Sequence, residues 1–110
     1  MDLTKRHCVP CEGGMPPMNK EEAEKYLKRI KSWKFIGNKI EKELKFKNFK
    51  KAMEFVNKVA ELAEDEGHHP DMLVYSWNKV KITTYTHAIG GLSENDFILA
   101  AKIDKLLQQI

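Results

Sequence analysis

The fold is most constrained by residues 48–87, which read NFKKAMEFVNKVAELAEDEGHHPDMLVYSWNKVKITTYTH. Apolar residues recur at helical spacing through the first part of this stretch, and Asn48 can cap the first turn. A long helix is therefore predicted up to about Glu66. Gly67 suits the position just after a helix, and Pro70 cannot continue one, so the helix is expected to stop before the two histidines.

Two strands are expected next, over Met72–Trp77 and Val80–His87, joined by a tight turn near residues 78–79. Strand side chains alternate between the two faces of a sheet, because they have a period of two. The second strand would therefore place Val80, Ile82, Thr84 and Thr86 on one face, and Lys81, Thr83, Tyr85 and His87 on the other.

The flanking segments complete the pattern. A helix over residues 20–31 would follow Asn19, which forms a capping-box pattern with Glu22, and two strands over residues 33–36 and 40–46 would surround the turn Gly37-Asn38. A final helix would be capped by Ser93 and run to about Leu107. The resulting order, α-β-β-α-β-β-α, predicts an α+β fold: a two-layer domain with a four-stranded, largely antiparallel sheet and three helices on one face.

Residues 1–18 contain two cysteines, two glycines and three prolines near one another, so we expect an irregular N-terminal arm before a domain spanning residues 19–110. The 19 basic and 16 acidic residues are interspersed along the chain, and the net charge is only +3. A nucleic-acid-binding protein usually gathers its basic residues on one side, and no such gathering is visible in this sequence. No apolar run approaches the roughly 18 residues that span a bilayer. We therefore expect a cytoplasmic protein whose partners include neither nucleic acid nor membrane.

Three of the four histidines lie in two short segments, which suggests a site for acid–base chemistry. His68 and His69 follow a helix end crowded with Glu64, Asp65 and Glu66, and His87 ends a predicted strand just before Gly90-Gly91. Acidic residues are locally unfavourable at a helix C-terminus, and such conflicts often mark functional sites. Nearby carboxylates would also favour the protonated imidazole that a general acid needs. The alternative is that both adjacent histidines are merely exposed loop residues.

Metal binding is the competing chemistry. His68, His69, His87 and Glu64 could supply four zinc ligands, but adjacent histidines are awkward partners and no His-x-x-x-His spacing occurs. Cys8-Val9-Pro10-Cys11 supplies only two thiols, so a reduced, non-catalytic pair is expected. A local disulfide within the arm and a metal shared between subunits are the alternatives for this motif. We predict no metal and no cofactor.

The pattern as a whole resembles the pterin-4a-carbinolamine dehydratases. The residues that carry the resemblance are Glu64-x-x-x-His68-His69-Pro70-Asp71, Val80-x-Ile82 leading to Thr86-His87, Gly91-Leu92-Ser93-x-x-Asp96, and the early Trp33. The match extends from about Asn19 to the C-terminus.

The resemblance implies a hydro-lyase that dehydrates 4a-hydroxytetrahydrobiopterin to quinonoid dihydropterin, recycling tetrahydrobiopterin without metal or redox cofactor. By analogy, His68 and His87 would exchange protons at the 4a-hydroxyl and His69 would mainly bind the pterin. Glu64, Trp33 and Asp96 would belong to the substrate-binding set, although the first role of Asp96 is expected to be as the third residue of a helix cap. The resemblance further implies a homodimer or homotetramer. A catalytically silent dimeric interaction module and a metal-binding regulator are the alternatives on the same fold.

Overall fold

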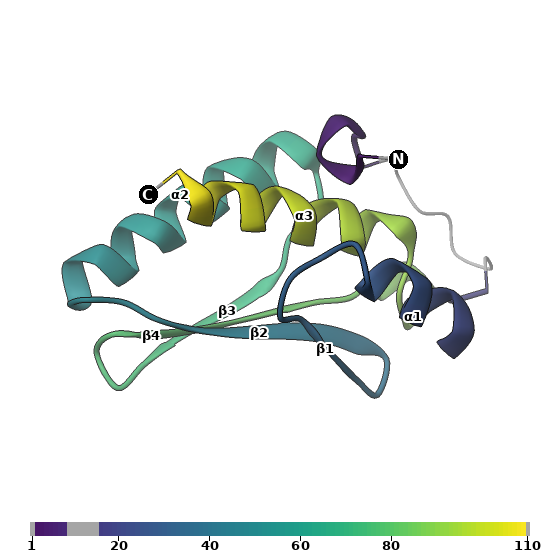
Figure 1. Ribbon diagram of the computed structural model, residues 1–110, viewed down its shortest axis with the longest axis horizontal. Helices are drawn as coiled ribbons and strands as arrows, with labels where there is room; N and C mark the ends of the chain where they lie inside the picture. The colour runs from purple at the N-terminus through teal and green to yellow at the C-terminus, as the bar shows by residue number, and fades with distance from the viewer. Residues whose placement is uncertain (1, 9–15, 110) are drawn as a thin grey trace.

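Four antiparallel strands form one sheet in the computed structural model, which describes residues 2–8 and 16–109. The sheet order is β1-β2-β4-β3, with β1 at Lys34–Ile36, β2 at Lys39–Lys45, β3 at Asp71–Tyr75 and β4 at Lys79–Thr84. Helices α1 (Lys20–Leu27), α2 (Phe49–Glu66) and α3 (Glu94–Gln108) lie on one side of the sheet (Figure 1). The predicted two-layer α+β fold and its element order are thus confirmed.

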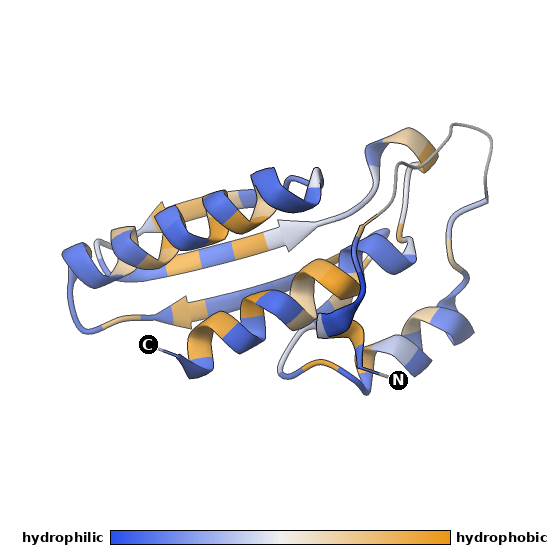
Figure 2. Ribbon diagram, turned by 90° about the horizontal axis from the view of Figure 1, so that it is seen from above, coloured by the Kyte–Doolittle hydropathy of each residue, from blue (hydrophilic) through white to orange (hydrophobic). Residues whose placement is uncertain are grey.

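The core lies between the helices and one face of the sheet. In the register, Ile82 of β4 stands between Lys42 of β2 and Met72 of β3, and Val80 stands between Leu44 and Val74. The side chains of Val80 and Ile82 are fully buried, and Thr84 and Thr86 follow them on the same face. The predicted alternation of β4 is confirmed, and Figure 2 shows the same change between apolar and polar positions along the strands.

Helix α3 is enclosed on nearly all sides along its first two turns. Every residue from Asn95 to Ala101 is buried. A short 3-10 helix, η1 (Leu3–Lys5), packs against α3 and inserts Leu3 into the core, so part of the segment expected to be irregular has regular structure. The sequence pattern missed this contact because a single-turn helix is too short to show periodicity.

Two predicted boundaries are wrong. Helix α1 ends at Leu27, four residues early, because the chain bends so that Ile30 enters the core and Ser32 adopts a positive φ of 60°. Strand β4 ends at Thr84, and His87 begins a second 3-10 helix, η2 (His87–Ile89), instead of ending the strand. Gly90, in the left-handed region at φ 66°, closes that turn, and Thr86 bridges to Gly91.

A buried ion pair joins the two layers. Lys42 of β2 lies 2.8 Å from a carboxylate oxygen of Asp104 on α3, with both side chains about nine-tenths buried. The indole N–H of Trp33 donates to the same oxygen at 3.0 Å, and the backbone N–H of Lys31 donates to the other at 3.0 Å. Because every oxygen is partnered, the charges are tolerated in the core. In the described part of the chain, no helix is long and apolar enough to cross a membrane.

Candidate active site

One pocket of about 380 Å³ gathers the three histidines singled out from the sequence. It lies where the turn after α2 meets the turn after β4, beside the N-terminal end of α3. Its lining comprises residues 67–71, residues 85–88 and Asn95. Segments nearly twenty residues apart in the chain are therefore brought together around one small cavity.

The imidazole of His68 is hydrogen-bonded to a buried carboxylate. Helix α2 ends at Gly67, whose φ of 66° turns the chain, and the backbone N–H of His68 still reaches the carbonyl of Ala63 at 3.2 Å. The imidazole Nε2 then lies 2.7 Å from Oδ1 of Asp96, and only 11% of the side chain of His68 is exposed. Since a carboxylate accepts hydrogen bonds, Nε2 carries the proton in this contact, and Nδ1 is the nitrogen left for chemistry.

Asp96 connects both histidine segments. As the third residue of α3 it accepts from the backbone N–H of Ser93 at 3.0 Å, completing the predicted capping box. The hydroxyls of Thr84 and Thr86 donate to the same carboxylate at 2.7 and 2.9 Å. Its side chain is fully buried, so it cannot touch a ligand directly. It fixes His68 on one side and the end of β4 on the other.

His69 points to a different partner. Its Nε2 lies 2.9 Å from a carboxylate oxygen of Glu64, and both side chains are mostly exposed. Adjacent residues in extended chain face opposite ways, which explains why His68 turns to α3 while its neighbour turns back to α2. Both nevertheless line the pocket. The exposed pair contributes little to stability, which leaves it available for binding.

His87 faces the pocket from the opposite segment. It is exposed at the start of η2, and its ring centroid lies 4.1 Å from that of Tyr85, with the planes tilted by 46°. Tyr85 and His87 share one face because they are two residues apart, while Thr86 between them points inward to Asp96. Sequence reasoning did not name Tyr85 or Asn95 as lining residues, although the alternation along the strand could have indicated Tyr85.

Trp33 lies elsewhere. Its indole is buried among the core residues and bonded to Asp104, and it is not one of the side chains that line the histidine pocket. Glu64 reaches the site only through His69. The structure therefore brings together His68, His69 and His87 directly, with Glu64 and Asp96 as their partners.

The cysteine motif is only partly described, because Cys11 lies outside the described residues. Burial, reinforced by the charge of Glu66, raises the pKa of the Cys8 thiol to about 12, so the thiol stays protonated. A protonated thiol is a poor nucleophile and metal ligand. Within residues 2–8 and 16–109, no three His, Cys, Asp or Glu side chains are grouped to hold a metal ion.

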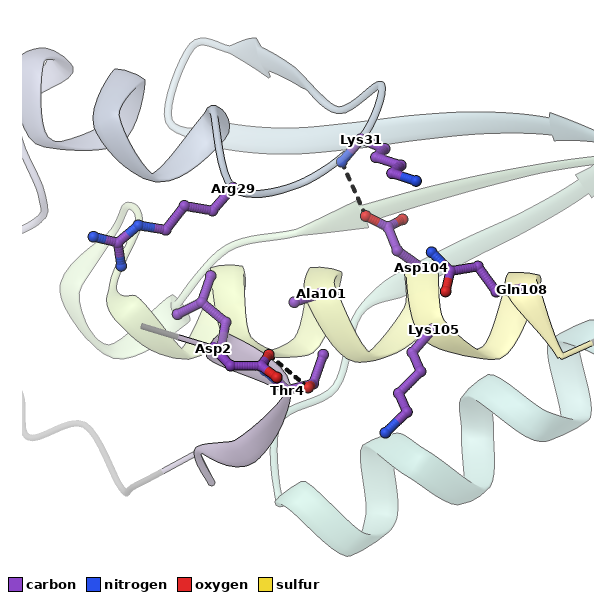
Figure 3. Close-up of a pocket in the computed structure, with 9 residues that line it drawn as sticks. Asp2, Thr4, Arg29, Lys31, Ala101, Asp104, Lys105 and Gln108 are labelled. Atoms are coloured by element: carbon purple, nitrogen blue, oxygen red, sulfur yellow. Dashed lines mark hydrogen bonds between the residues drawn. The ribbon is translucent and has the colours of Figure 1, made fainter.

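A second pocket, of about 350 Å³, lies between η1, α3 and the bend after α1 (Figure 3). Its cationic side chains, Arg29, Lys31 and Lys105, point in different directions, and the Asp104 carboxylate is turned toward the backbone of Lys31. None of the residues that line it is a histidine. The histidine pocket is thus the better candidate for an active site.

Comparison with known proteins places the chain among pterin 4 alpha carbinolamine dehydratases. A family model described as pterin 4 alpha carbinolamine dehydratase matches residues 16–106. A protein of Nitrosomonas europaea is 54% identical over 109 residues, covering 97% of this chain and 95% of the relative, and one of Alkaliphilus metalliredigens is 51% identical over 106 residues, covering 94% and 95%. The names of both assign them provisionally as pterin-4-alpha-carbinolamine dehydratases.

A solved structure shares the fold. The crystal structure of a transcriptional coactivator/pterin dehydratase from Brucella melitensis superimposes with a TM-score of 0.77 at 28% sequence identity. The match covers 82% of this chain and 97% of that one.

Proposed function

The chain belongs to the pterin 4 alpha carbinolamine dehydratase family, and we propose that it dehydrates 4a-hydroxytetrahydrobiopterin to quinonoid dihydropterin by histidine acid–base catalysis. Released quinonoid product would be reduced again, so the reaction would recycle tetrahydrobiopterin. The observation that carries this proposal is the meeting of three imidazoles in one pocket, one of them held by a buried carboxylate.

The reaction requires two proton movements. The C4a–O bond breaks as the 4a-hydroxyl gains a proton and leaves as water, while N5 loses its proton and forms a double bond to C4a. Water is the only other product, and no electrons enter or leave. Groups that both give and accept protons near neutral pH are therefore sufficient, and imidazole is the side chain that does so.

We assign the proton exchange to His68 and His87. With Nε2–H of His68 directed to Asp96, its Nδ1 can deliver a proton to the leaving hydroxyl or accept one, while the carboxylate stabilises the charged imidazolium. His87 approaches the cavity from the other segment, where a second proton-transfer group is needed. Asp96 is a positioning residue in this assignment and not a substrate ligand.

We assign pterin binding to His69, with Glu64 holding its ring through the 2.9 Å hydrogen bond. Both groups are exposed at the rim, where a polar heterocycle with several donors and acceptors would enter. We leave Trp33 out of this assignment, because its ring is buried in the core and its N–H is bonded to Asp104.

We also propose that the protein is a homodimer or homotetramer. Strand β3 is at one edge of the sheet, and Leu73 on its outer face is 53% exposed. An exposed apolar edge of this kind needs a covering partner, and a second copy is the simplest one. Analytical ultracentrifugation of the wild type and of Leu73→Lys tests this; a wild-type monomer at micromolar concentration would contradict it.

The activity is tested by stopped-flow absorbance with synthetic 4a-hydroxytetrahydrobiopterin. We expect the wild type to accelerate dehydration above the spontaneous rate and the double variant His68→Ala/His87→Ala to lose that acceleration. Glu61→Gln, an exposed change on α2, is the matched control. A catalytically silent interaction module would show no acceleration in the wild type, and an undiminished rate in the double variant would refute the histidine mechanism.

A further inference from the structure

Glu66, the last residue of α2, differs from the acidic residues beside it. Glu64 and Asp65 are exposed, whereas only 5% of the side chain of Glu66 is exposed. One carboxylate oxygen accepts from the ammonium of Lys102 at 2.7 Å and lies 3.3 Å from Nδ1 of His7. The other oxygen accepts from the backbone N–H of Cys8 at 2.8 Å. Three separate segments therefore meet at this carboxylate.

The carboxylate is ionised throughout the ordinary pH range. Burial alone would raise the pKa of Glu66, but the hydrogen bonds from Lys102, Cys8 and His7 outweigh burial and lower it to about 2. Such charge-assisted bonds are the stronger kind, because a full charge faces each donor. The end of α2 is thus tied firmly to α3 and to the N-terminal segment.

The N-terminal segment extends this connection to the beginning of α3. The thiol of Cys8 donates to the backbone carbonyl of Asn95 at 3.5 Å, and the guanidinium of Arg6 pairs with the carboxylate of Glu94. Leu3 anchors the segment in the core. Figure 1 shows it lying over the region where the end of α2 approaches α3. This segment precedes residue 16, where the match to the family model begins.

The contacts of Glu66 with Lys102 and Cys8, and of Cys8 with Asn95, connect the end of α2 to α3. The hydrogen bond from His68 to Asp96 connects the same two helices. Glu66 is two residues before His68, and Glu94 and Asn95 directly precede Asp96. The separation between the end of α2 and the start of α3 is therefore set on one side by the contacts of Glu66 and on the other by the 2.7 Å bond of His68 to Asp96. A shift of either helix end would lengthen that bond.

We propose that Glu66, through Lys102 and the segment Arg6–Cys8, is a positioning residue that keeps His68 bonded to Asp96. The inference rests on the proposed function, in which His68 transfers the proton. It adds a set of contacts that holds a proton-transfer group in place, of which only the segment Arg6–Cys8 precedes the residues that the family model matches. If Glu66 only stabilised the fold, its replacement would change the free energy of unfolding and leave the His68 imidazole unchanged. The test therefore observes His68 itself.

The decisive variant is Glu66→Gln, which removes the charge but keeps the shape; Glu61→Gln on the exposed face of the same helix is its control. Nitrogen-15 NMR of the imidazoles reports which nitrogen of His68 carries the proton and how quickly that proton exchanges with water. We expect a protected Nε2–H in the wild type and about tenfold faster exchange in Glu66→Gln. We expect kcat to fall about tenfold with little change in KM, because orientation and not binding is lost.

Arg6→Ala provides a second variant that leaves the core untouched, and it should change the His68 signal in the same direction by a smaller factor. Circular dichroism shows which variants are folded, and if Glu66→Gln does not fold, Arg6→Ala alone decides. An unchanged His68 signal in the folded variants would overturn the inference. Failure of the proposed function is distinguishable, since a wild type without dehydratase activity would still show whether Glu66 controls the His68 hydrogen bond.

Discussion

Nε2 of His68 lies 2.7 Å from Oδ1 of Asp96, a residue 28 positions later in the chain and completely buried. The carboxylate also receives hydrogen bonds from Thr84, Thr86 and the backbone of Ser93, so it cannot turn away. One buried group thus sets the protonated nitrogen of the proposed acid, caps α3 and holds the end of β4. Its replacement should affect catalysis and folding in separable ways.

Asp96→Asn should reduce kcat about 100-fold, because the amide can present N–H to Nε2 and so favour the tautomer protonated on Nδ1. KM should change little, since Asp96 does not reach the pocket. Stopped-flow kinetics, with thermal unfolding measured in parallel, checks this. Asp65→Asn, an exposed change near the end of α2, serves as control. A folded Asp96→Asn enzyme with wild-type kcat would show that the hydrogen bond does not orient the proton-transfer group.

His69→Ala should instead raise KM about tenfold while leaving kcat within a few-fold of the wild type, the result expected when an interaction common to ground state and transition state is removed. Glu64→Gln should act in the same direction and more weakly, because it only loosens the ring of His69. Initial-rate kinetics over a range of pterin concentrations measures both. A large loss of kcat in His69→Ala at unchanged KM would contradict this assignment and would indicate that His69 itself transfers a proton.

Lys42→Met should lower the free energy of unfolding by about 3–5 kcal/mol, because it leaves the charge of Asp104 buried without its partner. Replacing both residues, as Lys42→Met/Asp104→Leu, should recover much of this loss. Urea denaturation followed by the fluorescence of Trp33, which bonds to Asp104, reports the change; Trp77→Phe removes the second tryptophan signal. Equal stabilities for the single and double variants would contradict this explanation.

The stability contributed by Glu66 should disappear in acid. Hydrogen bonds depress its pKa in the folded state from 4.5 to about 2, so its contribution is complete above pH 4.5 and is lost as the pH falls toward 2. The difference in unfolding free energy between the wild type and Glu66→Gln should therefore shrink over this interval. Urea titrations at several pH values measure it. A difference that stays constant down to pH 2 would mean that the carboxylate is not held by these bonds.

The order of elements, the cap residues and the alternation of β4 followed from the sequence because these features are local. Asn48 and Ser93 cap α2 and α3 as predicted, and Val80 and Ile82 face the core as their spacing indicates. Periods of 2 and 3.6 residues are visible without knowing any distant contact. The same local signals grouped His68, His69 and His87, since each follows the end of a regular element.

The partners of those side chains could not be read from the chain, because they depend on how the two layers pack. The bond from His68 to Asp96, the place of Trp33 beside Asp104, and the meeting of Cys8 and Lys102 at Glu66 join residues 28 to 71 positions apart. Nothing in the spacing of a segment specifies which distant group will satisfy a buried charge. Sequence periodicity therefore established the helices, the strands and the location of the histidines, whereas the packing of α3 against the sheet and the N-terminal segment determined which histidine is hydrogen-bonded to a buried carboxylate.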